Sequence, residues 1–235
     1  MTYKIISLVA FSFLLFACKK TTNVNLVDSP DTGQLKYKIV DYAGLGVPEV
    51  TVLLYKADHL LHINFLNPER AAARLKTDQN GVAAFSELSP DNYLIIADSA
   101  MSNRMTYKIR EHIQVVAGIV KEKETKASDF SASLNLTIIS KRDHRTPVNN
   151  FRIAAVTADP ATFTGDLNEL VNNSAVRGIT NAQGFVTLKI PSEITCFLVF
   201  YNGDRAFFAP YPTYSFYRLE NKARYSTSLY VDAFN

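Results

Sequence analysis

The sequence predicts an all-β protein that consists of two tandem β-sandwiches, each with a short helical insertion. Many short stretches rich in β-branched and aromatic residues are separated by turn residues, a pattern typical of sandwiches. Residues 93–97 (YLIIA) and 197–201 (FLVFY) are apolar at successive positions, so both belong to strands that are covered on both faces. The same order of elements also occurs twice, with Thr77 and Thr180 at equivalent places 103 residues apart.

The composition fits a folded protein with room for two domains of about 100 residues each. Of the 235 residues, 47% are hydrophobic and 20% are charged. The formal net charge of +3 at pH 7 is spread along the chain, so we expect no nucleic-acid surface.

Residues 1–17 have the features of a signal peptide. Lys4 is followed by an apolar run, residues 5–17, which is too short to span a bilayer comfortably. The run ends at Cys18, and residues 15–18 (LFAC) resemble a bacterial lipobox. This resemblance implies that the Cys18 thiol accepts a diacylglyceryl group and becomes the first residue of the mature chain. The alternatives are an ordinary secretory signal or a membrane anchor with an incidental Cys.

The first sandwich is predicted over residues 35–121, after a polar tether over residues 18–34. Besides the stretch that follows the turn at Thr77, strands are expected at residues 34–41, 50–56, 92–99, 104–110 and 112–120. The insertion between the second strand and this turn contains Asn67 as a helix cap and Pro68 as the first helical residue, followed by ERAAARL at residues 69–75. These residues predict a short helix.

The second sandwich is predicted over residues 130–235, after a charged joint at residues 121–129. Its strands are expected at residues 132–141, 150–157, 176–180, 185–190, 196–203 and 224–234. The insertion falls at the same place as in the first copy, and residues 165–173 (GDLNELVNN) predict its short helix.

The first copy carries a set of residues in a characteristic order, namely Gly46, Val47, Pro48, Val50, Val52, Thr77, Asp78, Asn80, Gly81, Phe85, Leu88, Pro90 and Tyr93. This order resembles the carboxypeptidase regulatory-like domain, a transthyretin-like and immunoglobulin-like sandwich that is also similar to the B-repeats of Gram-positive adhesins. The second copy matches at Thr146, Pro147, Val148, Thr180, Asn181, Gly184, Phe185 and Pro191. The resemblance implies a fold rather than one function, because this module occurs in many different proteins.

The repeated turn, TDQNG at residues 77–81, allows two interpretations. Asp78 and Asn80 begin like a calcium loop, but the later oxygen ligands are missing and the second copy has Asn181 and Gln183 instead. The alternative is a structural corner, in which Asp or Asn hydrogen-bonds the local backbone and Gly supplies a positive φ. We favour the corner.

We expect no catalytic residues, no cofactor and no metal site. His59 and His62 have a helical spacing but no evident third ligand, and Cys196 lies in an apolar stretch without an accompanying His pattern. An isopeptide bond of the adhesin type would use Lys36 or Lys38 beside a buried acid, and the sequence places no such acid. The chain is therefore predicted not to be an enzyme.

Residues 207–217 (FFAPYPTYSFY) are unusually rich in aromatic side chains. Their prolines exclude a regular central strand there. One interpretation is a loop that covers the end of the second sandwich. The other is an aromatic platform for sugar rings or a partner protein, built from Phe207, Phe208, Tyr211, Tyr214, Phe216 and Tyr217.

These observations lead to one main hypothesis and two alternatives. The main hypothesis is a non-enzymatic lipoprotein that is anchored in the bacterial cell envelope and serves in binding, adhesion or assembly. Its signal and Lys-rich start resemble those of Bacteroidota lipoproteins, which implies the outer membrane, on either face. Its partners would be the membrane, through the lipid on Cys18, and a glycan or an envelope protein. The alternatives are a fimbrillin-like pilus subunit and a glycan-binding accessory lipoprotein.

Overall fold

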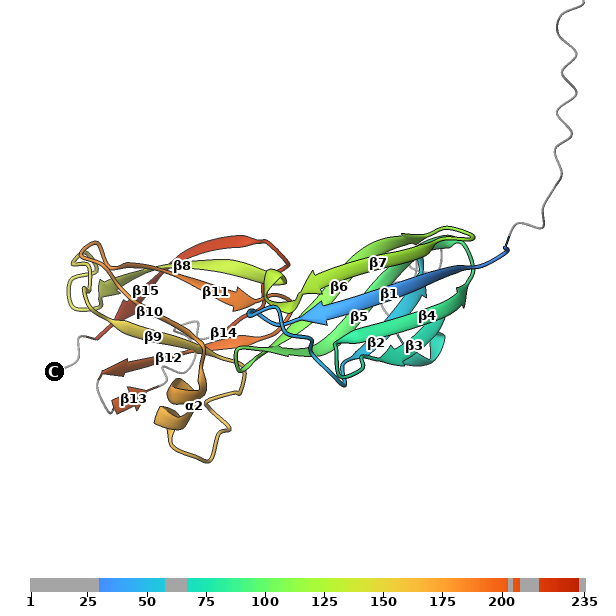
Figure 1. Ribbon diagram of the computed structural model, residues 1–235. Coiled ribbons are helices and arrows are strands. Elements are labelled where there is room, and N and C mark those ends of the chain that lie inside the picture. The colour runs from blue at the N-terminus through green and yellow to red at the C-terminus, as the bar shows by residue number, and fades with distance from the viewer. Residues whose placement is uncertain (1–29, 58–66, 203–204, 208–215, 233–235) are drawn as a thin grey trace, which may run out of the picture. The chain divides into compact units, whose positions relative to one another are not determined.

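Strands dominate the computed structural model, which describes residues 30–57, 67–202, 205–207 and 216–232 (Figure 1). The first copy contains β1 (Gly33–Val40), β2 (Thr51–Lys56), β3 (Ala73–Lys76), β4 (Val82–Leu88), β5 (Asp91–Ser102), β6 (Met105–Val115) and β7 (Val120–Lys126). The second contains β8 (Ser131–Ser140), β9 (Arg152–Val156), β10 (Val176–Ile179), β11 (Phe185–Pro191), β12 (Cys196–Asn202), β13 (Arg205–Phe207), β14 (Phe216–Tyr217) and β15 (Arg224–Val231).

Each copy is a sandwich of two sheets, so the predicted fold class is confirmed. In the first copy the strand orders are β4-β1-β7 and β3-β2-β5-β6. In the second they are β11-β8-β15 and β10-β9-β12-β13, with β14 also paired to β12. In both copies the last strand pairs in parallel with the first strand, β7 with β1 and β15 with β8. The two copies therefore share one topology.

A hydrophobic core lies between the sheets of each sandwich. Alternate residues of β1 (Leu35, Tyr37 and Ile39) are fully buried, as are Leu134, Leu136 and Ile138 of β8. This alternation follows from the two-residue period of a strand whose second face is wet.

Described residues of both insertions pack on the outer faces of the second sheets. In the second copy, helix α2 (Leu167–Asn173) begins at its cap Asp166 and packs Val171 against Ala154, Val156 and Val199. In the first copy, Ala71 packs against Leu53, Tyr55, Leu94 and Ile96. The middle strands of these sheets are therefore buried on both faces, which explains their uninterrupted apolar runs.

The structure corrects three of the predicted elements. In the described residues 67–72 of the first insertion, the helix is the 3-10 helix η2 (Pro68–Arg70), capped by Asn67 as predicted, and the last residues of the expected helix, 73–75, belong to strand β3 instead. Pairing of β3 with β2 prevails over the good helix propensity of these residues. The strands expected at 104–110 and 112–120 are mostly one strand, β6, because the turn comes later, at Gly118 with φ +71°.

The third correction concerns the charged joint predicted at residues 121–129. Residues 120–126 form β7, the last strand of the first sheet, and the short helix η3 (Ala127–Asp129) follows. The charges on β7 face solvent opposite lysines of β1, which allows a highly charged stretch to be an edge strand.

Candidate functional site

The repeated turns form equivalent corners in the two sandwiches. In the first copy the buried Thr77 hydroxyl donates a hydrogen bond to the Val47 carbonyl (2.7 Å) and accepts one from the Val50 N–H (3.0 Å). In the second, Thr180 donates to the Val148 carbonyl (2.7 Å) and accepts from the Phe151 N–H (2.8 Å). Each threonine therefore fastens the turn to the strand that begins the second sheet.

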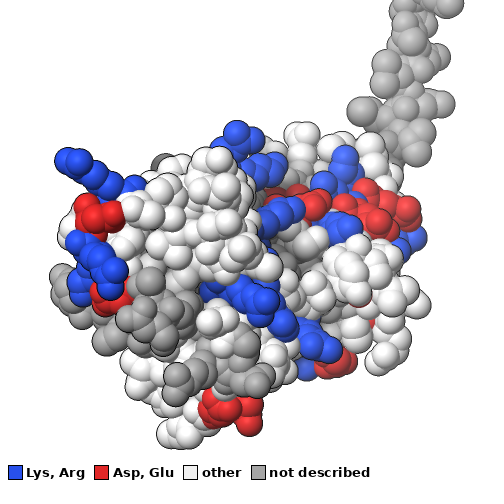
Figure 2. All heavy atoms as spheres, turned by 90° about the vertical axis from the view of Figure 1, so that its left-hand side faces the viewer, with Lys and Arg blue, Asp and Glu red and all other residues white. Residues whose placement is uncertain are grey.

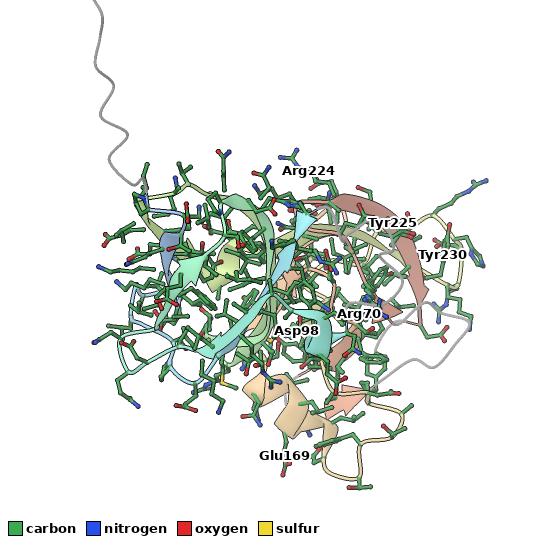
Figure 3. The ribbon with its side chains drawn as sticks, turned by 90° about the vertical axis from the view of Figure 1, so that its right-hand side faces the viewer. Arg70, Asp98, Glu169, Arg224, Tyr225 and Tyr230 are labelled. Atoms are coloured by element: carbon green, nitrogen blue, oxygen red, sulfur yellow. The ribbon has the colours of Figure 1, made fainter. Side chains whose placement is uncertain are left out.

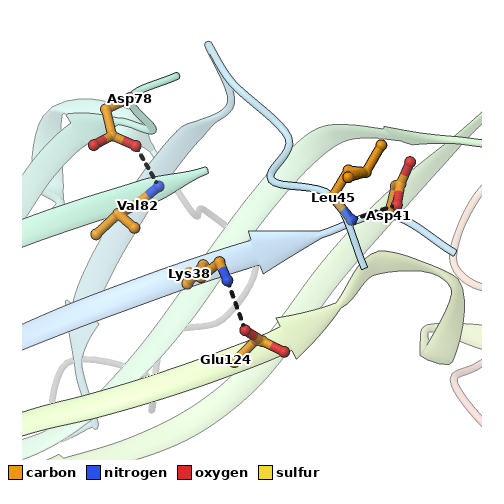
Figure 4. Close-up of polar contacts among 6 residues, drawn as sticks. All are labelled: Lys38, Asp41, Leu45, Asp78, Val82 and Glu124. Carbon is orange, nitrogen blue, oxygen red and sulfur yellow. Dashed lines mark hydrogen bonds and ion pairs between the residues drawn. The ribbon is translucent and has the colours of Figure 1, made fainter. Parts of the chain in front are cut away.

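The residue after each threonine holds the turn itself. Asp78 accepts hydrogen bonds from the backbone N–H groups of Asn80 and Val82 through one oxygen, and Figure 4 shows the bond from Val82. Asn181 accepts the equivalent bonds from Gln183 and Phe185. An amide oxygen thus replaces a carboxylate oxygen with the same geometry, so the corner does not depend on charge.

A glycine is required at the end of both turns. Gly81 has φ +78° and Gly184 has φ +69°, and a Cβ at either position would lie 2.4 Å from a carbonyl oxygen, that of Ile39 or Ile138. The contacts that the two turns share explain why each turn contains a Thr, an Asp or Asn, and a Gly. These residues hold the fold together, as the corner interpretation predicts. Among the described residues, no group of three or more His, Cys, Asp or Glu is placed to hold a metal ion.

One acidic side chain is enclosed by donors in the first sandwich. Glu111 of β6 accepts hydrogen bonds from the hydroxyls of Tyr37 and Thr125, each at 2.5 Å, and its other oxygen lies 3.6 Å from the Lys123 ammonium. Burial, followed by the nearby Glu111 charge, raises the pKa of Tyr37 far above its ordinary value. Tyr37 is therefore a neutral donor, and the cluster joins the two sheets at β1, β6 and β7.

The lysines considered for an isopeptide bond lie on the solvent face of β1. Lys36 forms an ion pair with Glu122 (3.0 Å), and Lys38 forms one with Glu124 (2.9 Å) (Figure 4). More than a third of each side chain is exposed, so neither lysine has the buried surroundings that this chemistry requires.

An open cleft of about 580 Å³ is the best candidate for a binding site among the described residues. Its lining comes from Tyr42, Asn103, Arg104, Ser174, Ala175 and Arg177. Asn103 and Arg104 form the two-residue turn between β5 and β6, both with positive φ. Arg177 is held in place because its Nε and Nη2 donate to the Ser174 and Asn172 carbonyls at the end of α2.

The chemistry of this cleft favours an anionic ligand. Two guanidinium groups, Arg104 and Arg177, supply planar arrays of donors that match carboxylate, sulfate or phosphate groups. The exposed ring of Tyr42 adds an apolar surface with a polar tip. Among the described residues, no acidic side chain lines the cleft. Sequence reasoning did not find this site, because these residues are far apart in the chain.

A second cleft, of about 490 Å³, carries charges of both signs. It is lined by Arg110, Glu193, Arg218, Leu219, Glu220 and Asn221. Arg110 and Glu193 form an ion pair at 3.3 Å, so part of the positive charge is already neutralised. This cleft is therefore a weaker candidate for anion binding. On the face drawn in Figure 2, basic and acidic groups are interspersed among large uncharged areas.

The aromatic segment is described only at its ends. Phe207 of β13 is half-buried, with its ring centroid 5.5 Å from that of Phe200. Tyr217 of β14 is buried in the core, 5.8 Å from the Tyr225 ring, and Phe216 pairs with β12 through its backbone. The other members of the predicted platform, Phe208, Tyr211 and Tyr214, lie outside the described residues, and so do Cys18, His59 and His62.

Cys196 is fully buried at the start of β12, and burial raises the pKa of its thiol to about 12. Such a thiol is a poor nucleophile, and the residue acts as a small apolar part of the core. Among the described residues, no helix is long and apolar enough to cross a membrane.

Comparisons with known proteins show no family and no curated sequence that matches this chain. Among solved structures, a minor pilin of Streptococcus agalactiae is 14% identical, with 87% of this chain and 97% of that chain covered and a TM-score of 0.36. The Bacillus anthracis TIE protein is 15% identical over 85% of this chain, with a TM-score of 0.35, and the match spans 34% of that chain. A putative carbohydrate-binding protein of Pseudomonas aeruginosa is 16% identical, covers 42% of this chain and 90% of that chain, and has a TM-score of 0.31.

Proposed function

We propose that this chain is a lipid-anchored protein of the bacterial envelope that binds an anionic, hydroxyl-rich ligand such as an acidic polysaccharide. The observation that carries the binding role is the cleft at Tyr42, Arg104 and Arg177, which combines two guanidinium groups with an exposed aromatic ring. Polysaccharides that contain uronic acids offer carboxylates for the arginines and a sugar face for the ring.

A binding role is also supported by the tasks of the other polar groups. Thr77, Thr180, Asp78 and Asn181 hold the corners, and Glu111 is enclosed by donors inside the first sandwich. These contacts are structural, because each ties a turn or a strand of a sandwich to its neighbour. The resemblance to carboxypeptidase regulatory-like domains supports two modules of this kind, predicted at residues 35–121 and 130–235, with strand β7 completing the first module.

The binding role is tested with polygalacturonate and a neutral polysaccharide such as dextran, measured by affinity electrophoresis of the purified chain. We expect polygalacturonate alone to retard the protein, and Arg104→Ala to remove most of that retardation. Arg70→Ala is the matched control, because Arg70 is an exposed arginine on η2, outside the cleft. Retardation that is absent, or that is lost equally with both substitutions, would contradict the proposal.

The anchor is supported by Cys18, which stands where the apolar run ends and a polar tether begins. We expect the wild-type chain to incorporate labelled palmitate and to sediment with outer membranes. The Cys18→Ala variant should do neither. If this variant stays in the membrane fraction as before, the lipid anchor is wrong.

As an alternative, the aromatic platform predicted within residues 207–217 would bind neutral sugars. A glycan array would show signals that fall with Tyr211→Ala and Tyr214→Ala, whereas signals unaffected by both would remove this alternative. The fimbrillin-like alternative predicts polymers of the purified chain, and a protein that never grows beyond small oligomers at high concentration would count against it.

A further inference from the structure

The final strands of the two sandwiches occupy equivalent positions but differ in charge. Strand β7 pairs with β1 and strand β15 pairs with β8, and among the described residues neither has a strand on its other side. The registers place Glu122 and Glu124 of β7 at the same positions as Ser226 and Ser228 of β15. The neighbouring Lys36 and Lys38 of β1 correspond to Asn135 and Thr137 of β8.

Charged side chains are one of the features that keep edge strands from pairing with other chains. Strand β7 has this protection, since its sequence, VKEKETK, alternates cations and anions. Strand β15, RYSTSLYV, has no charge after Arg224 and is rich in residues that favour strands. On its solvent face, Ser226 accepts a hydrogen bond from Asn135 (3.2 Å), where the first copy has a salt bridge.

The open edge of β15 presents a regular row of backbone groups that have no partner among the described residues. The carbonyls of Ala223 and Val231 accept hydrogen bonds from Ser133 and Lys141, which fixes the odd-numbered residues as those that bond to β8. In a parallel pair the intervening residues direct both N–H and C=O away from the partner. Ser226, Ser228 and Tyr230 therefore offer their peptide groups to the open edge.

We propose that this edge binds the same edge of a second copy of the chain, with the two β15 strands antiparallel and Ser228 opposite its own counterpart. Only residues that direct their peptide groups outward can form hydrogen-bonded pairs, and this register matches Ser226 with Tyr230 and Ser228 with Ser228. It also places Arg224 opposite Asp232 of the other copy, at both ends of the contact, so the charges that flank the strand attract each other.

The side chains along the edge are consistent with this arrangement. Figure 3 shows Arg224, Tyr225 and Tyr230 following one another along β15. Asp232 is 82% exposed, and its pairing with Lys141 of the same chain is loose, at 3.6 Å, so it remains available to a partner. A shift of two residues, with Ser226 at the centre, would place Arg224 opposite Ser228 and lose both ion pairs. The contact is isologous and closes as a dimer.

The register is tested by cysteine cross-linking of the full chain in detergent solution. The chain carries Cys18→Ser, and Cys196 is buried and unreactive. Opposed residues of a hydrogen-bonded pair have Cα atoms about 5.5 Å apart, within the range of a disulfide. We expect Ser228→Cys to give a disulfide-linked dimer on mild oxidation. Ser226→Cys should not, because its counterpart would lie about 13 Å away.

A dimer with Ser226→Cys, no dimer with either variant, or equal yields with both would overturn the proposal. A charge exchange tests the same register without cysteine. Arg224→Glu should weaken dimerisation by about 2- to 30-fold, the effect of two exposed ion pairs, and adding Asp232→Arg should restore it. If the second substitution restores nothing, the register is wrong. Both tests are independent of the proposed ligand and anchor.

Discussion

The two sandwiches agree in their corners and cores and differ at their free edges. The corner residues Thr77 and Thr180 make the same two hydrogen bonds, and each core is built from alternate residues of the first strand. The edges differ because Glu122 and Glu124 on β7 have serines as their equivalents on β15. The two copies thus share the corner contacts and the core that folding requires, while the charge of their edge strands differs. The contacts that are shared and those that are not can be tested separately.

The largest expected effect is in the cores, where the copies should respond alike. Ile95 and Leu198 are fully buried at equivalent places, since Ile95 pairs with Leu54 and Leu198 with Ala155. Ile95→Ala and Leu198→Ala should each lower the free energy of unfolding by about 2–5 kcal/mol, because each leaves a cavity. Urea denaturation followed by circular dichroism measures both. A near-zero cost for one of them would break the equivalence.

The corners should show the next largest effect, again in both copies. Thr77→Val and Thr180→Val keep the shape of the side chain but leave a buried carbonyl and N–H without their partner. We expect each to reduce the free energy of unfolding by about 1–3 kcal/mol. Thr187→Val, on the solvent face of β11, is the matched control and should change it by less than about 0.5 kcal/mol. Unequal losses at the two corners would show that only one of them is essential.

The second core should also respond to alkaline pH. Burial raises the pKa of the Cys196 thiol to about 12, whereas an unfolded Cys titrates near 8.5. The raised pKa leaves the free energy of unfolding unchanged below about pH 8.5. Above that pH the unfolded thiol loses its proton while the folded thiol keeps it, so the free energy of unfolding falls by about 1.4 kcal/mol per pH unit until the pH reaches the pKa of the folded state. Urea unfolding at pH 8.5 and 9.5 would show the loss, and Cys196→Ala should reduce it. An unchanged slope in this variant would mean that the thiol does not contribute.

The smallest change in stability is expected at the charged edge strand β7. This edge nevertheless gives the most direct comparison with the edge strand β15, which has no charge after Arg224. Glu122 and Glu124 form exposed ion pairs, each worth about 0–1 kcal/mol. Replacing both with Ser should therefore hardly alter the unfolding curve. It should, however, give β7 the character of β15 and cause new self-association, which sedimentation velocity would detect. A double variant that associates no more than the wild type would show that charge is not what protects this edge.

The sequence was informative where structure is decided locally. The turns at Gly81 and Gly184, the cap at Asn67 and the short helix within residues 165–173 could be predicted because their signals span a few residues. Strand β7 could not be predicted in this way, because its glutamates pair with lysines of β1 that lie 86 residues earlier in the chain. Its own residues alone have the composition of a polar linker. The helix expected after Pro68 was too long for the same reason, because pairing of β3 with β2 is a tertiary contact.

The candidate sites were harder to predict than the fold. Tyr42, Arg104 and Arg177 line one cleft although they come from two separate turns and from strand β10. The spacing of these residues in the sequence does not predict that they lie close together. The aromatic composition of residues 207–217 led instead to the prediction of a binding platform there. The described ends of that segment, Phe207 and Tyr217, pack against the core of the second sandwich.

Hydrogen exchange at the two edges tests the central claim most directly. The outward N–H groups of Ser226 and Ser228 on β15 and of Glu122 and Glu124 on β7 can be followed as the protein concentration is raised. We predict that exchange slows at Ser226 and Ser228, because they become hydrogen-bonded to a second copy, and stays unchanged at the two glutamates. Equal behaviour of the two edges, or exchange at Ser228 that is independent of concentration, would contradict the account.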